Sequence, residues 1–349
     1  MKTEPPHVGC YGFERSSSHC LFGFRIFTGL LLFLAVITAL GQSPKPEPDH
    51  SADSGSADQH QEQNGADMVR IGIAPGTWGS INRNDASAAI TAWAKVIMRQ
   101  RGMTLSVETT LFEADEDMTR ALRGGRVDAV SMLAHQFLRL DPQLQPDYVY
   151  LAARQEAFTE RYVLLVHRAA GIGDLSGLRG GRLLLAKNAR ASLGPFWLDT
   201  LLGRQSLGSA EAFFKSMTRL DSPSKVVLQV FFRQAEACLI TTNVFQLAGE
   251  LNPQLHKELR VLAVSPEVVP ALFCFRPGHA SRARELLEPA IFTLHESLAG
   301  QQVLAVFQCE QMVKRPLSCF GSTRELLAEY DRLKKPPALG LRKGVKPGT

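Results

Sequence analysis

Short apolar runs and longer amphipathic segments alternate along the chain between Met68 and Tyr330. The short runs are rich in β-branched and aliphatic residues, as buried strands are, and the longer segments carry apolar residues at helical spacing. In the first part the expected strands are 69–74, 105–109 and 127–133, and the expected helices are 86–101 and 115–122. Strands and helices that alternate with short links predict a parallel sheet covered by helices on both faces.

The same alternation then repeats. The second series predicts strands at 162–166, 182–186, 235–240, 260–264 and 270–275, and helices at 193–202, 225–232, 280–299 and 300–313. We expect the strand at 162–166 to leave the first half and the strand at 270–275 to return to it. The pattern therefore predicts an α/β protein with two lobes, each built on a parallel-type sheet with flanking helices, joined by two crossing strands.

An uncharged apolar segment lies near the N-terminus, from Ile26 to Leu40. Arg25 precedes it, and the small residues Ala39 and Gly41 stand where a signal peptidase cleaves. This arrangement predicts a secretory signal peptide over residues 1–41 and a periplasmic location. The segment is shorter than the ~20 residues that span a bilayer. Because the region before it is long, an uncleaved N-terminal membrane anchor is the alternative.

The segments that flank the two lobes have different compositions. Residues 42–67 contain almost no apolar side chain and predict a disordered linker. Residues 331–349 are rich in proline, glycine, lysine and arginine and predict a basic disordered tail. The expected lobes are then 68–165 plus 270–330 for lobe 1 and 166–269 for lobe 2.

Composition and cysteine spacing narrow the function further. Of the 349 residues 45% are hydrophobic and 21% charged, and the net charge of +5 is spread along the chain, which argues against nucleic-acid binding. None of the six cysteines forms a C-x-x-C pair or a cluster with zinc spacing, so we expect no metal and no cofactor. Cys309 and Cys319 are close enough in sequence for a disulfide, and two buried thiols are the alternative.

Three short motifs carry a family resemblance. The segments Leu122–Ala129 (LRGGRVDA), Leu175–Leu183 (LSGLRGGRL) and Arg233–Leu239 (RQAEACL) resemble, in order and spacing, elements of the phosphate/phosphite/phosphonate-binding proteins of ABC transporters. In the third motif Glu236 replaces the usual aspartate, and we expect it to order loops. The resemblance covers about residues 69–275 and implies the two-lobed type 2 periplasmic-binding-protein fold, with a ligand in the cleft and hinge closure around it.

The same resemblance implies a monomer that captures a small anionic ligand and docks on an ABC permease. One stretch departs from the family pattern. Of the hydroxyl-rich turn that holds the phosphonate, residues 187–195 (KNARASLGP) retain only Ser192 and Gly194. A helix N-terminus still binds anions, and Lys187 and Arg190 would add positive charge. We therefore expect an anion site in this loop.

Ligands of open α/β sheets bind beyond the carboxyl ends of the strands. The residues expected there as ligand-binding are Thr77, Trp78, Ser131, His135, Tyr162, Lys187, Arg190, Ser192, Ser222, Ser224, Thr241 and Thr242. Each has a structural alternative: packing for Trp78 and Tyr162, and capping of a helix for His135, Ser222 and Ser224.

Sequence signatures of catalysis are missing. The chain has no G-x-S-x-G, H-E-x-x-H or Walker motif and no G-x-G-x-x-G after its first strand, so we expect no enzymatic activity. The expected function is capture of a phosphorus oxyanion for an ABC transporter. The alternative is a periplasmic protein that senses a ligand and signals to a membrane receptor.

Overall fold

The computed structural model describes residues 67–77, 105–306 and 308–334, together with Ala88, Thr91, Ala92, Lys95 and Met98. The chain divides into two compact units, Met1–Glu62 and Gln63–Thr349, and every described residue lies in the second. The expected signal segment, nearly all of the expected linker and the tail from residue 335 onward therefore lie outside the described residues. Among the residues described, no helix is both long and apolar enough to cross a membrane.

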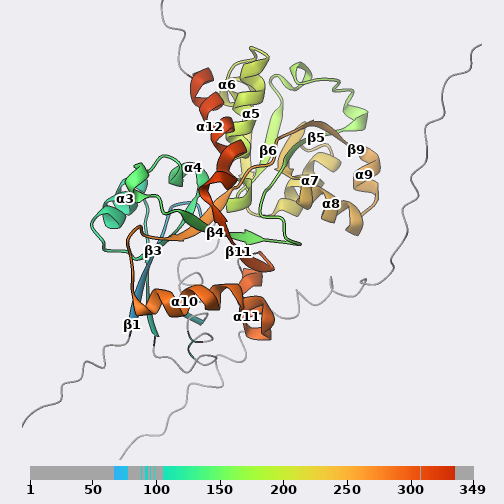
Figure 1. The fold of residues 1–349 in the computed structure, drawn as a ribbon. Helices are drawn as coiled ribbons and strands as arrows, with labels where there is room; N and C mark the ends of the chain where they lie inside the picture. Colours follow the sequence, from blue (N-terminus) through green and yellow to red (C-terminus); the bar gives the residue numbers. More distant parts are fainter. Residues whose placement is uncertain are drawn as a thin grey trace, which may run out of the picture. The chain divides into compact units, whose positions relative to one another are not determined.

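The first lobe is built on a six-stranded sheet with the order β11-β4-β10-β3-β1-β2 (Figure 1). β1 (Asp67–Ile73) pairs in parallel with both β2 (Leu105–Leu111) and β3 (Ala129–Leu133). The other three strands, which extend the sheet in antiparallel pairing, are β10 (Ala271–Phe275), β4 (Tyr148–Ala153) and β11 (Gln311–Pro316).

Helices cover both faces of this sheet. Successive side chains of a strand point to opposite faces, so each strand contributes side chains to the hydrophobic cores on both sides of the sheet. Ile71 and Ile73 of β1 pack in a core with residues of α10 (Arg282–Phe292), whereas Val130 and Met132 of β3 pack with residues of α3 (Asp115–Arg123). Burial of these faces is the main stabilising term of the lobe.

The second lobe repeats the plan with five strands in the order β7-β6-β8-β5-β9. β6 (Arg182–Ala186) pairs in parallel with β7 (Ser216–Leu220) and β8 (Ala237–Thr241). β5 (Tyr162–His167) pairs in antiparallel fashion with β8 and with β9 (Leu259–Val264). α5 (Gly194–Arg204) contributes to the core on one face and α7 (Pro223–Phe231) to the core on the other.

The expected fold class is confirmed: an α/β protein with two sheets, flanking helices and two crossing segments. Each sheet is mixed, with three mutually parallel strands on one side that include an edge strand: β2, β1 and β3 in the first sheet, and β7, β6 and β8 in the second. The strands next to the crossing segments, β5 and β10, enter their sheets in the antiparallel direction because the chain passes directly from one sheet to the other, without a helical crossover.

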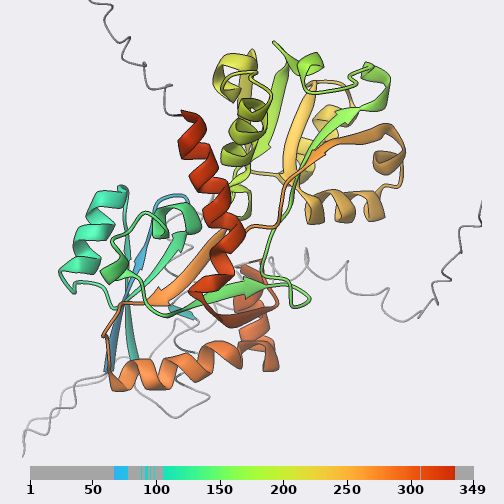
Figure 2. The ribbon, with the colours of Figure 1, turned by 45° about the horizontal axis from the view of Figure 1, so that its top comes forward.

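Three parts of the chain connect the lobes. The crossing segments before β5 and before β10 pair with each other through Glu160 and Val268, with N–O distances of 2.8 and 2.9 Å. α12 (Gly321–Lys334) is the third connection and lies along α5 in Figures 1 and 2. Phe320 packs in the first-lobe core just before α12 begins, and Leu326 and Leu327 pack in the core that contains α5.

Two of the expected lobe boundaries differ from this arrangement. The expected division after residue 165 falls inside β5, which pairs with β8 from Tyr162 onward, so the chain has left the first sheet by then. The expected tail begins at residue 331, whereas α12 continues to Lys334, whose Nζ lies 3.4 Å from Asp199 Oδ2 of α5. Packing of Leu333 and Lys334 against α5 therefore continues the helix into the expected tail.

The prediction of a helix over 300–313 is wrong at its C-terminal end. α11 (Leu298–Val306) ends early, Gln308 adopts a left-handed φ of 53°, and β11 begins at Gln311. Pairing with β4 makes residues 311–316 a strand, and apolar periodicity alone cannot show that a partner strand lies nearby.

β4, β7 and α12 were not expected from the pattern either. All four described cysteines, including Cys309 and Cys319, are free thiols, and burial raises the pKa of these two to about 11.

Candidate functional site

In each lobe the acidic residue of a family motif, Asp128 or Glu236, forms an ion pair with an arginine of a neighbouring strand. Asp128 accepts hydrogen bonds from Arg70 N at 2.9 Å, Arg70 Nε at 2.9 Å and Arg70 Nη2 at 2.7 Å. Glu236 accepts the equivalent three bonds from Arg182, at 2.6, 3.1 and 3.0 Å. Each acid directly precedes the N-terminal end of a strand, β3 or β8. The motif residues therefore stabilise the fold and lie far from the C-terminal strand ends, where ligands of such sheets bind.

The sequence-predicted site residues lie at the other edge, where the parallel strands of each sheet end; we call it the carboxyl edge. In the first lobe Thr77 follows β1, and His135 lies in α4 (Ala134–Phe137) directly after β3. In the second lobe the loop 187–192 follows β6, Ser222 precedes α7, and Thr242 begins α8 (Thr242–Leu251). Tyr162 pairs with Thr241 and so lies at the same edge.

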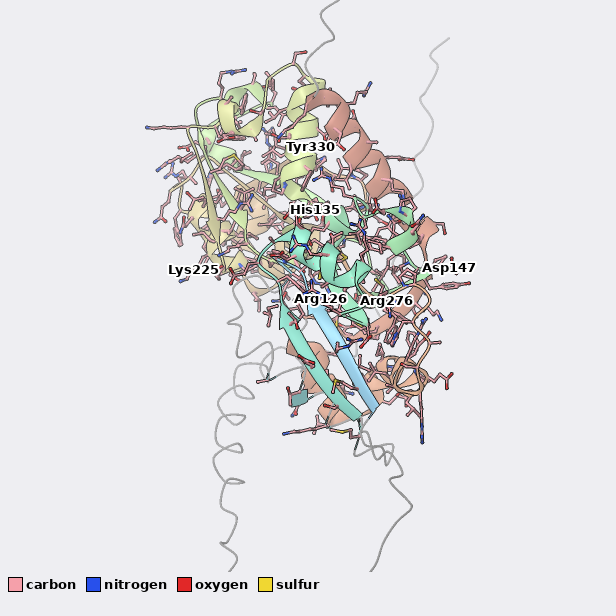
Figure 3. All side chains as sticks on the ribbon, turned by 90° about the vertical axis from the view of Figure 1, so that its left-hand side faces the viewer. Arg126, His135, Asp147, Lys225, Arg276 and Tyr330 are labelled. Carbon is pink, nitrogen blue, oxygen red and sulfur yellow. The ribbon has the colours of Figure 1, made fainter. Side chains whose placement is uncertain are left out.

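Contacts between the lobes bring the two carboxyl edges together. Ser192 Oγ donates to the carbonyl of Pro270 at 3.3 Å, and Ala134 N donates to the same carbonyl at 2.9 Å. The ring of His135 lies 4.9 Å from the ring of Phe196 in α5. Phe196 also contacts Tyr330 of α12, which Figure 3 labels with His135.

Two polar atoms at the first-lobe edge are buried and have no hydrogen-bond partner among the residues described: Thr77 Oγ1 and His135 Nδ1. Buried polar groups without a partner are uncommon, and each calls for an explanation. Burial, together with the positive charge of Arg139, lowers the pKa of His135 to about 4. The imidazole is therefore neutral at pH 7 and can donate one hydrogen bond to an anion without carrying charge itself.

The lowered pKa of His135 predicts a specific pH dependence of stability. An unfolded histidine titrates near 6.5, so the unfolded chain takes up this proton first, and stability should fall as the pH decreases from 6.5 toward 4. We expect His135→Gln to remove roughly 2 kcal/mol of this loss. The measurement is urea unfolding of both proteins between pH 4 and 7.5 in phosphate-free buffer. Parallel stability curves would contradict the assignment, because other acids titrate equally in both.

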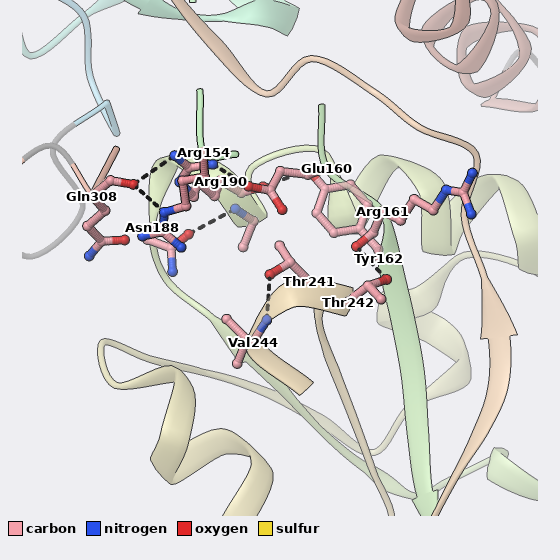
Figure 4. Close-up of polar contacts among 11 residues, drawn as sticks. Arg154, Glu160, Arg161, Tyr162, Asn188, Arg190, Thr241, Thr242, Val244 and Gln308 are labelled. Carbon is pink, nitrogen blue, oxygen red and sulfur yellow. Dashed lines mark hydrogen bonds and ion pairs between the residues drawn. The ribbon is translucent and has the colours of Figure 1, made fainter. Parts of the chain in front are cut away.

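The loop 187–192 is ordered by its own polar groups and by Tyr162 (Figure 4). Asn188 Oδ1 accepts from Ala191 N at 2.9 Å and caps the short 3-10 turn η4 (Ala189–Ala191). The hydroxyl of the fully buried Tyr162 donates to the carbonyl of Arg190 at 2.8 Å. Tyr162 therefore shapes the loop through its main chain.

Both cations of the expected anion loop have acidic partners. Arg190 Nη1 pairs with Glu160 Oε1, and Arg190 Nη2 donates to the carbonyl of Gln308 at 2.8 Å. The exposed Lys187 Nζ lies 3.7 Å from Asp221 Oδ1. The loop therefore offers a ligand no free guanidinium. The N–H groups of Lys187, Ala191 and Ser192 donate within the protein, which leaves those of residues 188–190 as the available backbone donors.

Most of the other predicted binding residues have local structural contacts. Ser222 Oγ accepts from Lys225 N and Thr241 Oγ1 from Val244 N, both at 3.4 Å, so each caps the helix it precedes. Thr242 Oγ1 donates to the carbonyl of Arg161 at 3.2 Å. Ser224 is exposed in the first turn of α7, and Ser131 lies within β3. Trp78 lies outside the described residues.

Sequence reasoning missed the residues around the Arg190 side chain, which are its partners Glu160 and Gln308 and the neighbouring cation Arg154. Glu160 and Arg154 lie between β4 and β5, and Gln308 precedes β11. Nothing in their spacing distinguishes them from solvated polar residues, because their partners are 30 to 154 positions away in the chain. Across the described part of the chain, no group of three or more His, Cys, Asp or Glu side chains could hold a metal ion.

Several solved structures share this fold. XAC2383 from Xanthomonas citri, bound to ATP, is 18% identical with a TM-score of 0.53, over 76% of this chain and 98% of that chain. PhnD1 from Prochlorococcus marinus, in complex with methylphosphonate, is 15% identical with a TM-score of 0.52, over 76% and 99%. A binding protein component of an ABC phosphonate transporter from Pseudomonas aeruginosa (PA3383) is 14% identical with a TM-score of 0.53, over 77% and 88%.

No curated protein sequence matches the chain. The model of one protein family does match, over residues 80–315, and its description reads "ABC transporter, phosphonate, periplasmic substrate-binding protein". This family binds small ligands for ABC permeases and is a transport component, not an enzyme. The match spans both lobes and confirms the resemblance carried by the three short motifs. The chain therefore belongs to the family of periplasmic substrate-binding proteins of ABC phosphonate transporters.

Proposed function

We propose that the protein binds a small phosphorus oxyanion, such as phosphate, phosphite or a phosphonate, between the two carboxyl edges and delivers it to an ABC permease. Export by residues 1–41 is part of this proposal. The family supports it, and so do the ligands of its structural relatives: methylphosphonate in PhnD1, and ATP and chloride in XAC2383 are all anions.

The observation that carries the proposal is the pair of unpartnered polar atoms, Thr77 Oγ1 and His135 Nδ1. A buried polar group that lacks a hydrogen bond costs ~1–3 kcal/mol. A ligand oxygen that accepts from each would remove this penalty. Both groups are neutral at pH 7, since the pKa of His135 lies well below 7. The Thr77 hydroxyl and an imidazole protonated at Nδ1 can each donate to one oxygen of an oxyanion, which presents several acceptors.

The second lobe would supply backbone donors to the same ligand. α5 and α8 both begin at the carboxyl edge, and both exceed two helical turns. The first N–H groups of a helix lie at the positive end of its dipole, which favours anions. In α8 the N–H groups of Thr242 and Val244 already donate to Arg161 and Thr241, so α8 would act mainly through its dipole. Ser192 stands two residues before α5 and can turn its hydroxyl from Pro270 to a ligand oxygen.

We expect phosphate, phosphite or methylphosphonate to raise the melting temperature of the purified protein. A ligand at one hundred times its Kd adds ~2.7 kcal/mol to the free energy of unfolding, which corresponds to a shift of several degrees for a protein of this size. The measurement is thermal unfolding against each anion, with sulfate and an uncharged amide as controls. Ser192→Ala should reduce the shift, because it removes one second-lobe donor.

A shift with one phosphorus oxyanion that sulfate does not reproduce would support the proposal and name the ligand. Equal shifts with every anion would indicate nonspecific binding to basic side chains. No shift with any anion would overturn the assignment and direct attention to uncharged organic ligands.

A further inference from the structure

Three parts of the chain meet at the side chain of Arg190. Arg190 belongs to η4 of the second lobe, Glu160 to the crossing segment, and the Gln308 carbonyl to the first-lobe segment before β11. The Glu160 side chain is 6% exposed and that of Arg190 is 17% exposed. A charged pair this deeply buried depends strongly on its partner, because removing one charge leaves the other unpaired in a poor solvent.

The Gln308 carbonyl receives two guanidinium groups. Arg154 Nε donates to it at 2.7 Å and Arg190 Nη2 at 2.8 Å, as Figure 4 shows. Burial lowers the pKa of Arg154, and the nearby positive charge of Arg190 lowers it further. The Glu160 carboxylate has the opposite effect on Arg154 and pairs directly with Arg190. Glu160, with a smaller effect from Glu310, thus supplies the negative charge that allows the two cations to share one acceptor.

The crossing segment before β5 binds both the side chain and the main chain of Arg190. Glu160 binds the guanidinium, and Tyr162, two residues later, donates to the main-chain carbonyl of the same arginine. Glu160 is in turn fixed by its backbone pairing with Val268 of the other crossing segment. The conformation of the loop 188–192 is therefore tied to the hinge between the lobes.

We propose that Glu160 and Arg190 are positioning residues for ligand binding. Their ion pair holds the loop 188–192 in the conformation that bonds the Ala191 and Ser192 amides internally and presents the backbone N–H groups of residues 188–190 to the ligand. The inference rests on the proposed function, since it assigns a role within the same site. It also predicts that the ion pair orders the loop in the unliganded protein.

The test compares Glu160→Gln with Glu267→Gln. Glu267 pairs with Arg161 at 2.8 Å on the same pair of crossing segments, but both side chains are more than half exposed, and among the described residues no hydrogen bond or ion pair joins either side chain to the loop. We expect Glu160→Gln to raise the Kd for the oxyanion found by thermal unfolding at least about tenfold, and Glu267→Gln to change it less than about twofold. Hydrogen exchange of the Ala191 and Ser192 amides in unliganded protein should accelerate only in Glu160→Gln.

A purely structural role would lower the melting temperature of Glu160→Gln without changing the Kd or the exchange of these amides relative to the rest of the lobe; that result would overturn the inference. If Glu160→Gln does not fold, Arg190→Lys keeps the buried charge paired but cannot reach Glu160 and Gln308 together, and the same two readouts apply. If wild-type protein binds no oxyanion, the proposed function fails, and the exchange of the two amides still decides whether the pair orders the loop.

Discussion

Replacing Asp128 with alanine is expected to destabilise the protein by about 2 to 3 kcal/mol, because it removes a buried carboxylate and its charge-assisted hydrogen bonds, while the Arg70 side chain left behind is 39% exposed. The Asp128 side chain is 3% exposed and accepts three hydrogen bonds from Arg70. His279 Nδ1 lies 3.5 Å from Asp128 Oδ1. Alanine leaves the Arg70 guanidinium and its backbone N–H without this acceptor. Urea unfolding at pH 7 measures the change.

The second lobe offers the matched control. Glu236 makes the same three bonds to Arg182, but the two side chains are 38% and 49% exposed, so water can replace the lost partner. We expect Glu236→Ala to cost no more than about 1 kcal/mol. Equal losses in the two variants would show that burial does not set the strength of this motif.

The Asp128 pair also fixes a direction for acid destabilisation. Burial alone raises the pKa of Asp128, but the hydrogen bonds and charge of Arg70 outweigh it, so the pKa is lowered. The stabilisation is then fully present above the pKa of an unfolded aspartate, about 3.9, and is lost as the pH falls through the lowered value.

Replacing Thr77 with valine should weaken ligand binding while leaving the unliganded protein as stable as before, or more stable by about 1 kcal/mol. Valine has nearly the same shape as threonine and removes a buried hydroxyl that has no partner in the described part of the chain. If this hydroxyl binds the ligand, the Kd should rise roughly tenfold or more. Calorimetric titration and urea unfolding of the same protein measure the two effects.

Thr323→Val is the control for this experiment. Thr323 is fully buried, and its hydroxyl accepts from Val269 N at 2.9 Å, so valine leaves a buried N–H unpaired. This variant should lose about 1 to 3 kcal/mol of stability, the opposite sign from Thr77→Val. If Thr77→Val is equally destabilised and binds the ligand normally, Thr77 has a structural partner and no role in the site.

Much of the fold was predictable because its signals are local. The strand at 182–186 was predicted with the observed bounds, and α3, β8 and β10 within two residues or so, since short aliphatic runs and helical spacing report burial directly. The order of the three motifs predicted the family. Positions near strand ends predicted which residues would lie at the carboxyl edges, because parallel strands end on the same side.

The candidate site was predictable only in outline. The pattern indicated that Arg190 and Ser192 stand before a helix, but not that Arg190 is paired with a buried glutamate. Nor could it show that Thr77 Oγ1 and His135 Nδ1 are both buried without partners. Exposure and pairing of a polar side chain depend on residues far away in sequence, and periodicity contains no information about them.

Local sequence patterns were therefore enough to establish the α/β plan with two lobes, the crossing at residues near 160 and 270, and the membership of a substrate-binding family. Those properties follow from local burial patterns and short motifs. Three features became apparent only in the folded protein: residues 311–316 pair as an edge strand, α12 packs on α5, and Glu160 pairs with Arg190. Each of these depends on a partner brought near by folding, and the stability of a strand edge or an ion pair is set by that partner.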